Sequence, residues 1–170
     1  MNPTNLRFNF GYLIEAPSGT SSDIEINYPS MRLDDVVLRP LNGQFRATRT
    51  SEGILIQGQF QTLMETECVR CLEMTLLEVE TAVEEIFYYP AYTAPEGDYV
   101  VHEDGNADLG PLVREMSLLA LPMQVLCKPD CLGLCPDCGQ NFNVGTCDCE
   151  PDDIDPRLAV LRSLLKPAND

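Results

Sequence analysis

The sequence predicts an α+β fold: an antiparallel β-sheet with packed helices, followed by a C-terminal extension rich in cysteine. Three observations support this. Apolar and polar side chains alternate in the first half of the chain, a helical apolar stripe follows, and the cysteines gather towards the end. A chain of 170 residues can bury one core. We expect a sheet-and-helix domain over residues 1–122 and a Cys-rich extension with a C-terminal helix over residues 123–170.

The clearest strand signal lies in residues 54–67, ILIQGQFQTLMETE. One parity carries Ile54, Ile56, Phe60 and Met64, while the other carries mostly Gln and Glu. A period of two over this length is typical of a strand with one buried face. Upstream, GQFRATRT followed by SEG predicts another strand and the turn that joins the two.

Residues 72–89 predict the return strand, with a bulge where the apolar parity changes at Leu76 and Leu77. The Cys68-Val-Arg-Cys71 segment would then lie at the tip of an antiparallel hairpin. Earlier in the chain, MRLDDVVLRPLNG predicts a strand that ends in a turn at Asn42-Gly43.

After an exposed loop over residues 90–106, with a short strand from Tyr99 to Val101, a helix is expected from Asp108 to Leu121. Asp108 would cap this helix, and Pro122 would stop it. Its apolar stripe is Leu109, Leu112, Val113, Met116, Leu119 and Ala120. A last helix is expected after Asp155-Pro156-Arg157, ending at Lys166-Pro167.

The charge is uneven along the chain. Residues 1–66 carry 5 Lys or Arg against 7 Asp or Glu, whereas residues 67–170 carry 6 against 20, for a net charge of −16. Nucleic-acid binding over a wide surface depends on Lys and Arg, so a basic protein is the easier electrostatic match. Alternatively, the charge serves only to keep the protein in solution.

The first residues lack the pattern of a secretory signal, and no apolar run approaches the roughly 18 residues of a membrane span. We therefore expect a cytoplasmic protein with no membrane association, in a compartment that keeps thiols reduced. There, clustered cysteines are more often metal ligands than disulfides.

The eight cysteines form four close pairs. A Cys-x-x-Cys turn lets two thiolates reach one ion, and tetrahedral structural zinc takes four thiolates. In CPDCGQ, Pro136 shapes such a turn and Gly139 permits the tight backbone after the second sulfur. We predict one or two structural zinc ions, with Cys68, Cys71, Cys127, Cys131, Cys135, Cys138, Cys147 and Cys149 as the ligands.

The simplest compact site joins Cys135 and Cys138 to Cys147 and Cys149, because the loop between the pairs is short. The strained bite of a Cys-x-Cys pair leaves open that one of its members is a spectator. The remaining four cysteines, Cys68, Cys71, Cys127 and Cys131, would form a second site that pins the sheet to the extension.

Nothing in the sequence indicates an enzyme. Sulfur-only ligation leaves no open metal position, and no Gly-rich phosphate loop or Ser-His-Asp set is present. The single histidine, His102, is expected to be solvated, as are the carboxylate pairs Glu84/Glu85 and Asp152/Asp153. We expect no small-molecule substrate.

Taken in order, these segments resemble the YceD family, which is named for large ribosomal RNA subunit accumulation. The resemblance rests on the Cys68-Val-Arg-Cys71-Leu-Glu segment, the helix ending in Leu119-Ala-Leu-Pro122, the segment from Cys131 through Cys135-Pro-Asp-Cys138-Gly-Gln to Asn141-Phe-Asn143, and the Asp155-Pro156-Arg157 start of the last helix. It covers about residues 40 to 165 and is specific because these parts occur together in this order.

The resemblance implies a cytoplasmic, non-enzymatic factor needed for accumulation or processing of large-subunit ribosomal RNA, with the eight cysteines as ligands. Its partner would be a basic large-subunit ribosomal protein or an rRNA precursor. Direct RNA contact would have to use Arg32, Arg39, Arg46 and Arg49, with Phe45 between two of them. Arginines scattered on an exposed strand face are ordinary, however, and we favour that interpretation over an RNA site.

Two other readings remain open. A zinc-gated redox sensor or chaperone would release zinc on oxidation, but it needs thiols of low pKa. The nearby acids Asp130, Asp137, Asp148 and Glu150 are expected to raise the pKa of those thiols. Iron in place of zinc would make the protein a rubredoxin-like electron carrier.

Overall fold

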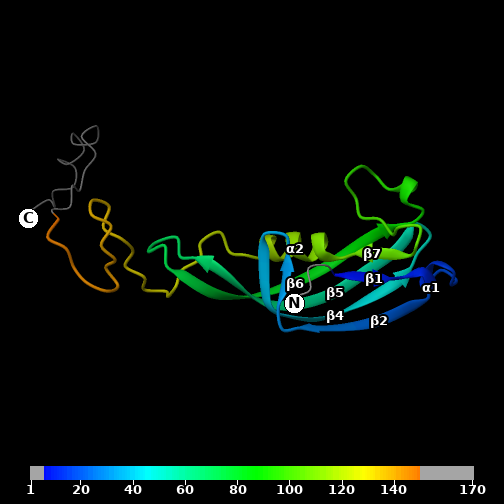
Figure 1. The fold of residues 1–170 in the computed structure, drawn as a ribbon, viewed down its shortest axis with the longest axis horizontal. Coiled ribbons are helices and arrows are strands. Elements are labelled where there is room, and N and C mark those ends of the chain that lie inside the picture. Colours follow the sequence, from blue (N-terminus) through cyan, green and yellow to red (C-terminus); the bar gives the residue numbers. More distant parts are fainter. Residues whose placement is uncertain (1–5, 150–170) are drawn as a thin grey trace, which may run out of the picture.

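The computed structural model describes residues 6–149 and shows a predominantly antiparallel β protein. A five-stranded sheet has the order β2-β4-β5-β6, with β3 paired to β4, and β1 and β7 form a separate two-stranded sheet (Figure 1). The elements are β1 (Arg7–Asn9), α1 (Gly11–Ile14), β2 (Ser21–Tyr28), β3 (Met31–Leu33), β4 (Val36–Arg49), β5 (Gly53–Glu67), β6 (Met74–Tyr88), the 3-10 turn η1 (Ala91–Thr93), β7 (Asn106–Asp108) and α2 (Gly110–Leu119).

The expectation of packed helices is overstated. Within residues 6–149, α2 is the one helix longer than a single turn, since α1 has only 4 residues. The helix expected after Asp155 lies outside the described residues. No helix in residues 6–149 is long and apolar enough to cross a membrane.

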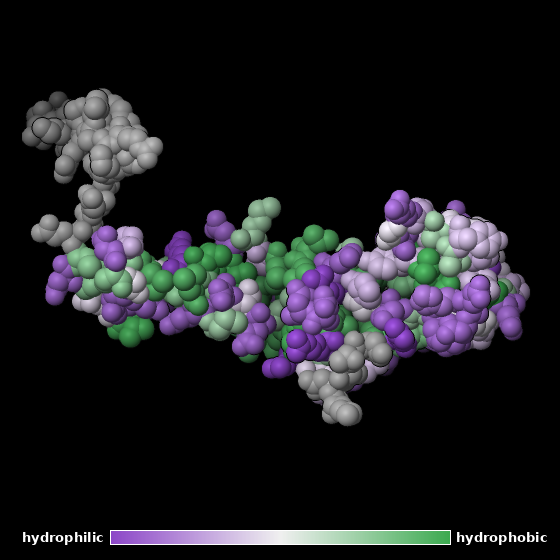
Figure 2. Space-filling view, turned by 45° about the horizontal axis from the view of Figure 1, so that its top comes forward, coloured by the Kyte–Doolittle hydropathy of each residue, from purple (hydrophilic) through white to green (hydrophobic). Residues whose placement is uncertain are grey.

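The core lies between one face of the large sheet and the elements α1, β1, β7 and α2. Phe10 and Leu13 from the N-terminal segment and Leu112 and Val113 from α2 are buried against sheet residues such as Phe60 and Phe87. The distal part of the β5–β6 hairpin extends beyond this body, and the Cys-rich segment lies at its tip (Figure 1). Hydrophobic and hydrophilic residues are interspersed along this narrow part of the molecule (Figure 2).

The β5–β6 hairpin confirms the strongest strand prediction. Ile54, Ile56, Phe60 and Met64 are all buried. The bulge expected at Leu76 and Leu77 is wrong, because the pairing of β5 with β6 runs without a shift from Gly53↔Tyr88 to Glu67↔Met74. Leu77 keeps the buried parity, and Leu76 is simply an exposed leucine on the other face. The register shift lies instead in β4, between Leu38 and Leu41, around Pro40, which has no N–H for the ladder.

The turn expected at Asn42-Gly43 is also wrong, because β4 continues through both residues. Gly43 pairs with Phe60, and Gly58 pairs with Phe45 on the same two strands. A Cβ at Gly43 would collide with the backbone oxygen of Gln59, and one at Gly58 would lie 2.5 Å from Cβ of Phe45. The glycines therefore make room for two core phenylalanines, whose ring centroids are 6.3 Å apart.

Helix α2 begins near the predicted position and ends two residues early. The Gly110 N–H donates to Oδ1 of Asp108 over 2.9 Å, which satisfies a donor of the first turn. Leu109, Leu112 and Val113 are buried as expected. The predicted stripe is wrong at its end, because Leu119 is 76% exposed and Ala120 is exposed too.

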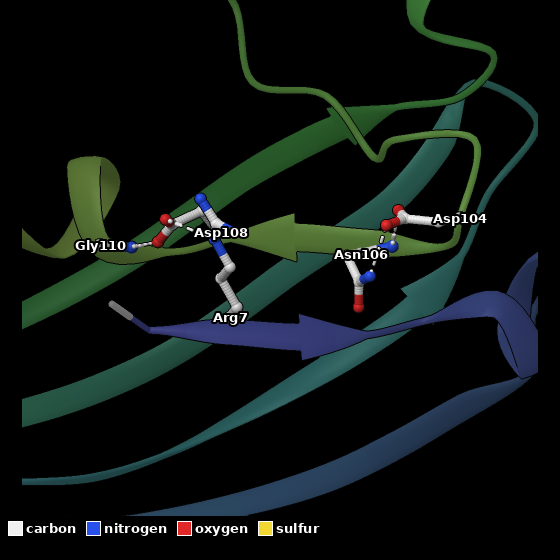
Figure 3. A network of polar contacts seen from close by, with 5 residues as sticks. All are labelled: Arg7, Asp104, Asn106, Asp108 and Gly110. Carbon is white, nitrogen blue, oxygen red and sulfur yellow. Dashed lines mark hydrogen bonds and ion pairs between the residues drawn. The ribbon is translucent and has the colours of Figure 1, made fainter. Parts of the chain in front are cut away.

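Strand β7 was not expected, whereas the strand predicted from Tyr99 to Val101 is reduced to one bridge between Val100 and Tyr88. Figure 3 shows the polar contacts that hold β7: Arg7 Nε donates to Oδ2 of Asp108 over 3.3 Å. At the preceding turn the carboxylate of Asp104 accepts from the Asn106 backbone N–H and side-chain amide over 3.0 and 2.7 Å. These two bonds lower the pKa of Asp104.

Candidate metal centres

The structure gathers the eight cysteines into two groups of four, with all Sγ atoms of a group within 4.8 Å of one another. Site 1 consists of Cys68, Cys71, Cys127 and Cys131, and site 2 of Cys135, Cys138, Cys147 and Cys149. This is the grouping expected from the spacing of the pairs. All eight cysteines lie within the described residues and are free thiols.

The sulfur positions fit a tetrahedral ion. Four sulfurs that each lie about 2.3 Å from a tetrahedral zinc ion are separated by roughly 3.8 Å. In site 1 the Sγ atoms of Cys68 and Cys131 are 3.7 Å apart, and those of Cys71 and Cys127 are 3.5 Å apart. Each group can therefore hold one metal ion, and sulfur-only ligation suits structural zinc.

The two Cys-x-x-Cys turns have the same backbone geometry. The Cys68 N–H donates to the Glu73 carbonyl, and the Leu72 N–H donates back to the Cys68 carbonyl, both over 2.9 Å. In the same way Cys135 donates to Gln140 and Gly139 donates to Cys135, over 2.8 and 2.9 Å. The fifth residue of each turn is left-handed, with φ of 59° at Leu72 and 73° at Gly139.

Backbone amides in site 1 favour thiolates. Burial alone would raise the pKa of Cys68, but the N–H groups of Cys127, Cys71 and Arg70 point at its sulfur and lower its pKa to about 6. Burial and the three neighbouring sulfurs raise the pKa of Cys127 to about 12. Without an ion the group cannot hold four thiolates, whereas a dication offsets their repulsion.

Site 2 shows the same division in a more open setting. The backbone N–H groups of Cys138 and Asp137 lower the pKa of Cys135 to about 7. The Cys138 sulfur and burial raise the pKa of Cys149 to about 12. The expectation that nearby carboxylates raise the pKa is wrong for Cys135, because the hydrogen bonds from the two backbone amides lower its pKa. Cys138 is exposed, whereas three of the four cysteines of site 1 are buried.

Two asparagines support the sites in a way that the cysteine pattern did not indicate. Asn143 Nδ2 lies 3.4 Å from Sγ of Cys131, and its Oδ1 accepts the Leu132 N–H over 3.0 Å. Asn141 Oδ1 accepts from Nδ2 of Asn143 over 2.8 Å, while Asn141 Nδ2 donates to Glu73 over 2.9 Å. The one sequence signal for them is that both asparagines belong to the segment from Cys131 to Asn143 on which the family resemblance rests.

The Cys-rich segment is fastened to the hairpin tip by further contacts. Arg70 Nη1 donates to the Cys131 carbonyl over 2.8 Å, and the Val69 N–H donates to the Val125 carbonyl over 2.9 Å. Gly133, with φ of 80°, approaches the Arg70 backbone so closely that an added Cβ would lie 3.2 Å from its oxygen. Site 1 therefore joins two parts of the chain that are distant in sequence.

The other candidate residues are not brought together as a site. His102 and Glu84 are exposed, as expected, whereas Glu85 is half-buried and its Oε1 accepts the Ile86 N–H over 3.1 Å. Asp152, Asp153 and Glu150 lie outside the described residues.

The arginines considered for RNA contact are largely engaged within the protein. Arg46 binds Asp23 through two bonds of 2.7 and 3.0 Å, and Arg49 donates to the carbonyls of Thr50 and Gly53 over 2.7 and 3.1 Å. Arg32 donates to the Asp34 carbonyl over 3.1 Å, while Arg39 is exposed. Phe45 is 2% exposed and so cannot stack on a base.

A comparison with known protein families finds a match that spans both sites. The family model described as "Large ribosomal RNA subunit accumulation protein YceD" matches residues 56–165, which include the whole hairpin tip and all eight cysteines. No solved structure matches the chain.

Three relatives illustrate the range of similarity. The uncharacterized protein Rv2926c of Mycobacterium tuberculosis is 32% identical over 168 residues, or 94% of this chain and 78% of the relative. The uncharacterized protein YlbN of Bacillus subtilis is 30% identical over 131 residues, or 76% of each chain. The Zea mays protein "Large ribosomal RNA subunit accumulation protein YCED homolog 1, chloroplastic" is 33% identical over 64 residues, or 37% of this chain and 22% of the maize protein.

Proposed function

Since the chain belongs to the YceD family, we propose that it is a non-enzymatic ribosome-biogenesis factor that promotes accumulation or processing of large-subunit ribosomal RNA in the cytoplasm. The observation that carries the proposal is the family match over residues 56–165. The name of the maize relative supports it, because that protein is named for accumulation of the large ribosomal RNA subunit.

Structural zinc at both sites is part of the proposal. The Sγ separations in site 1, the sulfur-only ligands and the amides that face the sulfurs all favour it. Bound zinc would supply folding free energy, because it holds the segment from Cys127 to Cys149 in a compact form and attaches it to the hairpin tip. The eight cysteines would act as ligands and not as nucleophiles.

A basic large-subunit ribosomal protein is the partner that the charge favours over an rRNA precursor. The net charge of −16 opposes contact with a phosphate backbone. The arginines that could have offset it are mostly engaged in bonds within the protein, as described above.

The test is to deplete the protein in cells, complement with wild type or Cys135→Ser, and measure the ratio of large- to small-subunit ribosomal RNA with precursor ends mapped. We expect depletion to lower the ratio and wild type to restore it. Cys135→Ser should restore it only partly, because site 2 loses a ligand. An unchanged ratio on depletion would contradict the proposed function.

A further inference from the structure

One face of the large sheet is open to solvent. Alternate residues of β2, β4, β5 and β6 point away from the core, and in the register of the sheet they form four rows that cross all four strands. The row Ser21-Thr48-Leu55-Ile86 is mostly half-buried, which leaves three polar and largely exposed rows. The rows are Asp23-Arg46-Gln57-Glu84, Glu25-Gln44-Gln59-Ala82 and Asn27-Asn42-Gln61-Glu80. Eleven of these twelve residues are exposed, and Asn42 is half-buried.

The rows place different chemistry on different strands. The outer strands carry carboxylates, Asp23 and Glu25 on β2 and Glu80 and Glu84 on β6. The two central strands carry side-chain amides at Asn42, Gln44, Gln57, Gln59 and Gln61. Because neighbouring strands are about 4.8 Å apart, the carboxylates on β2 are separated from those on β6 by about 14 Å. A band of amides thus runs between two acidic borders.

This face is hollowed at its centre. A cavity of about 810 Å³ is lined by residues of all four strands, including Glu25, Gln44, Gln59 and Ala82. The small side chain of Ala82 lies in the middle row between longer ones. Beside the cavity, the Oδ1 atom of Asn42 is buried and has no hydrogen-bond partner among the described residues. Asn42 does not line the hollow, which offers space and the side-chain amides of Gln44, Gln57 and Gln59.

The charges on this face are only partly compensated. Asp23 is neutralised by its two bonds to Arg46, and Glu80 accepts a hydrogen bond from Gln61 over 3.0 Å. Glu25 and Glu84 form no ion pair or hydrogen bond with the described residues. The face therefore keeps a negative charge on both borders, while its centre carries amide donors and acceptors and one cation, Arg46, which is paired with Asp23.

We propose that this face binds an extended segment of a protein partner that carries Arg or Lys at alternating positions. In an extended segment successive side chains point to opposite sides. A segment lying along the amide band would direct its basic side chains alternately to Glu25 and Glu84, while its backbone groups meet the glutamines. The inference rests on the proposed function, to which it adds the chemistry and the binding site of the partner.

Single-stranded RNA fits this face less well. Its phosphates would lie against carboxylates on both borders, and the exposed rows contain no aromatic side chain on which a base could stack. Arg46, the one cation in the rows, is already bound to Asp23.

The test measures binding of the zinc-loaded protein to a short fluorescent peptide of alternating Arg and Thr. A Gln-Thr peptide and an oligouridine of the same length serve as comparison probes. The variant Glu25→Lys/Glu84→Lys replaces one carboxylate on each border, in both cases the one without a partner, by a cation. Its matched control, Glu96→Lys/Glu103→Lys, changes the net charge equally at two exposed loop positions. A second variant, Ala82→Tyr, fills the hollow without changing charge, with a residue that strands accept well.

We expect the Arg-Thr peptide to bind and the other two probes not to bind. Glu25→Lys/Glu84→Lys should weaken peptide binding about tenfold or more, and Ala82→Tyr about fivefold, while the control pair changes it less than about twofold. Equal weakening by both charge pairs would show that the overall acidity is responsible and would overturn the proposal. Binding of oligouridine in preference to the peptide would also overturn it.

The same variants separate this inference from the proposed function. If depletion lowers the large-subunit RNA and Glu25→Lys/Glu84→Lys restores it as well as wild type does, the proposed function holds and the binding face is wrong. If depletion has no effect while the peptide still binds as expected, the binding face holds and the proposed function is wrong.

Discussion

At the scale of single residues, the two Cys-x-x-Cys turns differ at one informative position. Both need a left-handed residue after the second cysteine, and site 2 uses Gly139 where site 1 uses Leu72. A left-handed conformation costs a residue with a Cβ roughly 1–2 kcal/mol, whereas glycine adopts it freely. The sequence predicted this role for Gly139 but could not indicate it for Leu72.

Replacing Leu72 by glycine should therefore stabilise the zinc-loaded protein. Leu72 is 61% exposed, so little packing is lost. After the entropy cost of glycine is subtracted, we expect Leu72→Gly to raise the free energy of unfolding by about 0.5 kcal/mol relative to wild type. Leu72→Val should lower it by about 1 kcal/mol relative to wild type, because a β-branched residue is strained in this conformation. Urea unfolding measures both. Leu132→Gly, at an exposed position without a left-handed backbone, should be destabilising, and a gain there equal to that of Leu72→Gly would refute the argument.

Asn143 should matter to metal retention although it is not a ligand. Its amide faces Sγ of Cys131, and its oxygen holds the Leu132 N–H. Loss of such a supporting bond commonly weakens metal affinity about 10- to 100-fold. We expect Asn143→Ala to lose zinc from site 1 at correspondingly lower concentrations of a chromophoric chelator. Asn27→Ala, on β2, is the control and should retain zinc as wild type does. Equal retention by both variants would mean that the bond to sulfur contributes nothing.

At the scale of elements, the sequence predicted best where one buried face dictates a regular period. The alternation in β5 identified that strand and its inward residues, and the hairpin tip followed from it. The turn predicted at Asn42-Gly43 was wrong, because a small residue at position 43 is needed for a different reason. Gly43 lies in β4 and leaves room for Phe60 on the neighbouring strand. Such a cross-strand requirement cannot be read until the register is known.

The paired glycines of β4 and β5 give a prediction about the sheet. A side chain at Gly58 would lie 2.6 Å from the Gln44 backbone oxygen, and the backbone cannot move away without breaking the ladder. Gly58→Val should therefore lower the free energy of unfolding by about 3 kcal/mol, despite the high strand propensity of valine. Thr66→Val, a half-buried position on the same strand, is the control and should be nearly neutral. Thermal unfolding compares the two, and equal midpoints would contradict the close approach.

At the scale of the whole molecule, the two candidate metal sites differ in how they are built into the chain. Site 1 joins the hairpin tip to the segment after α2, so its cysteines come from positions about 60 residues apart. Site 2 is local to residues 135–149. The cysteine spacing was enough to predict the grouping, because a short loop favours a local site and leaves the other four for each other. The contacts of Arg70, Gly133 and Asn141 required the fold, since nothing in their spacing singles them out.

Removal of metal should therefore proceed in two steps. Cys138 is exposed and Cys147 and Cys149 are half-buried, so a chelator reaches site 2 before site 1, where Cys68, Cys71 and Cys131 are buried. Zinc release should be biphasic, with alkylation of the cysteines of site 2 in the first phase as read by mass spectrometry.

The far-UV circular dichroism of the sheet should change little in either phase, because the core of the body does not include the cysteines. Cys138→Ser should abolish the fast phase and leave the slow one intact, since each site has its own four cysteines. Release of both ions in one phase, or alkylation of Cys68 and Cys71 first, would show that the hairpin tip opens before the local site does.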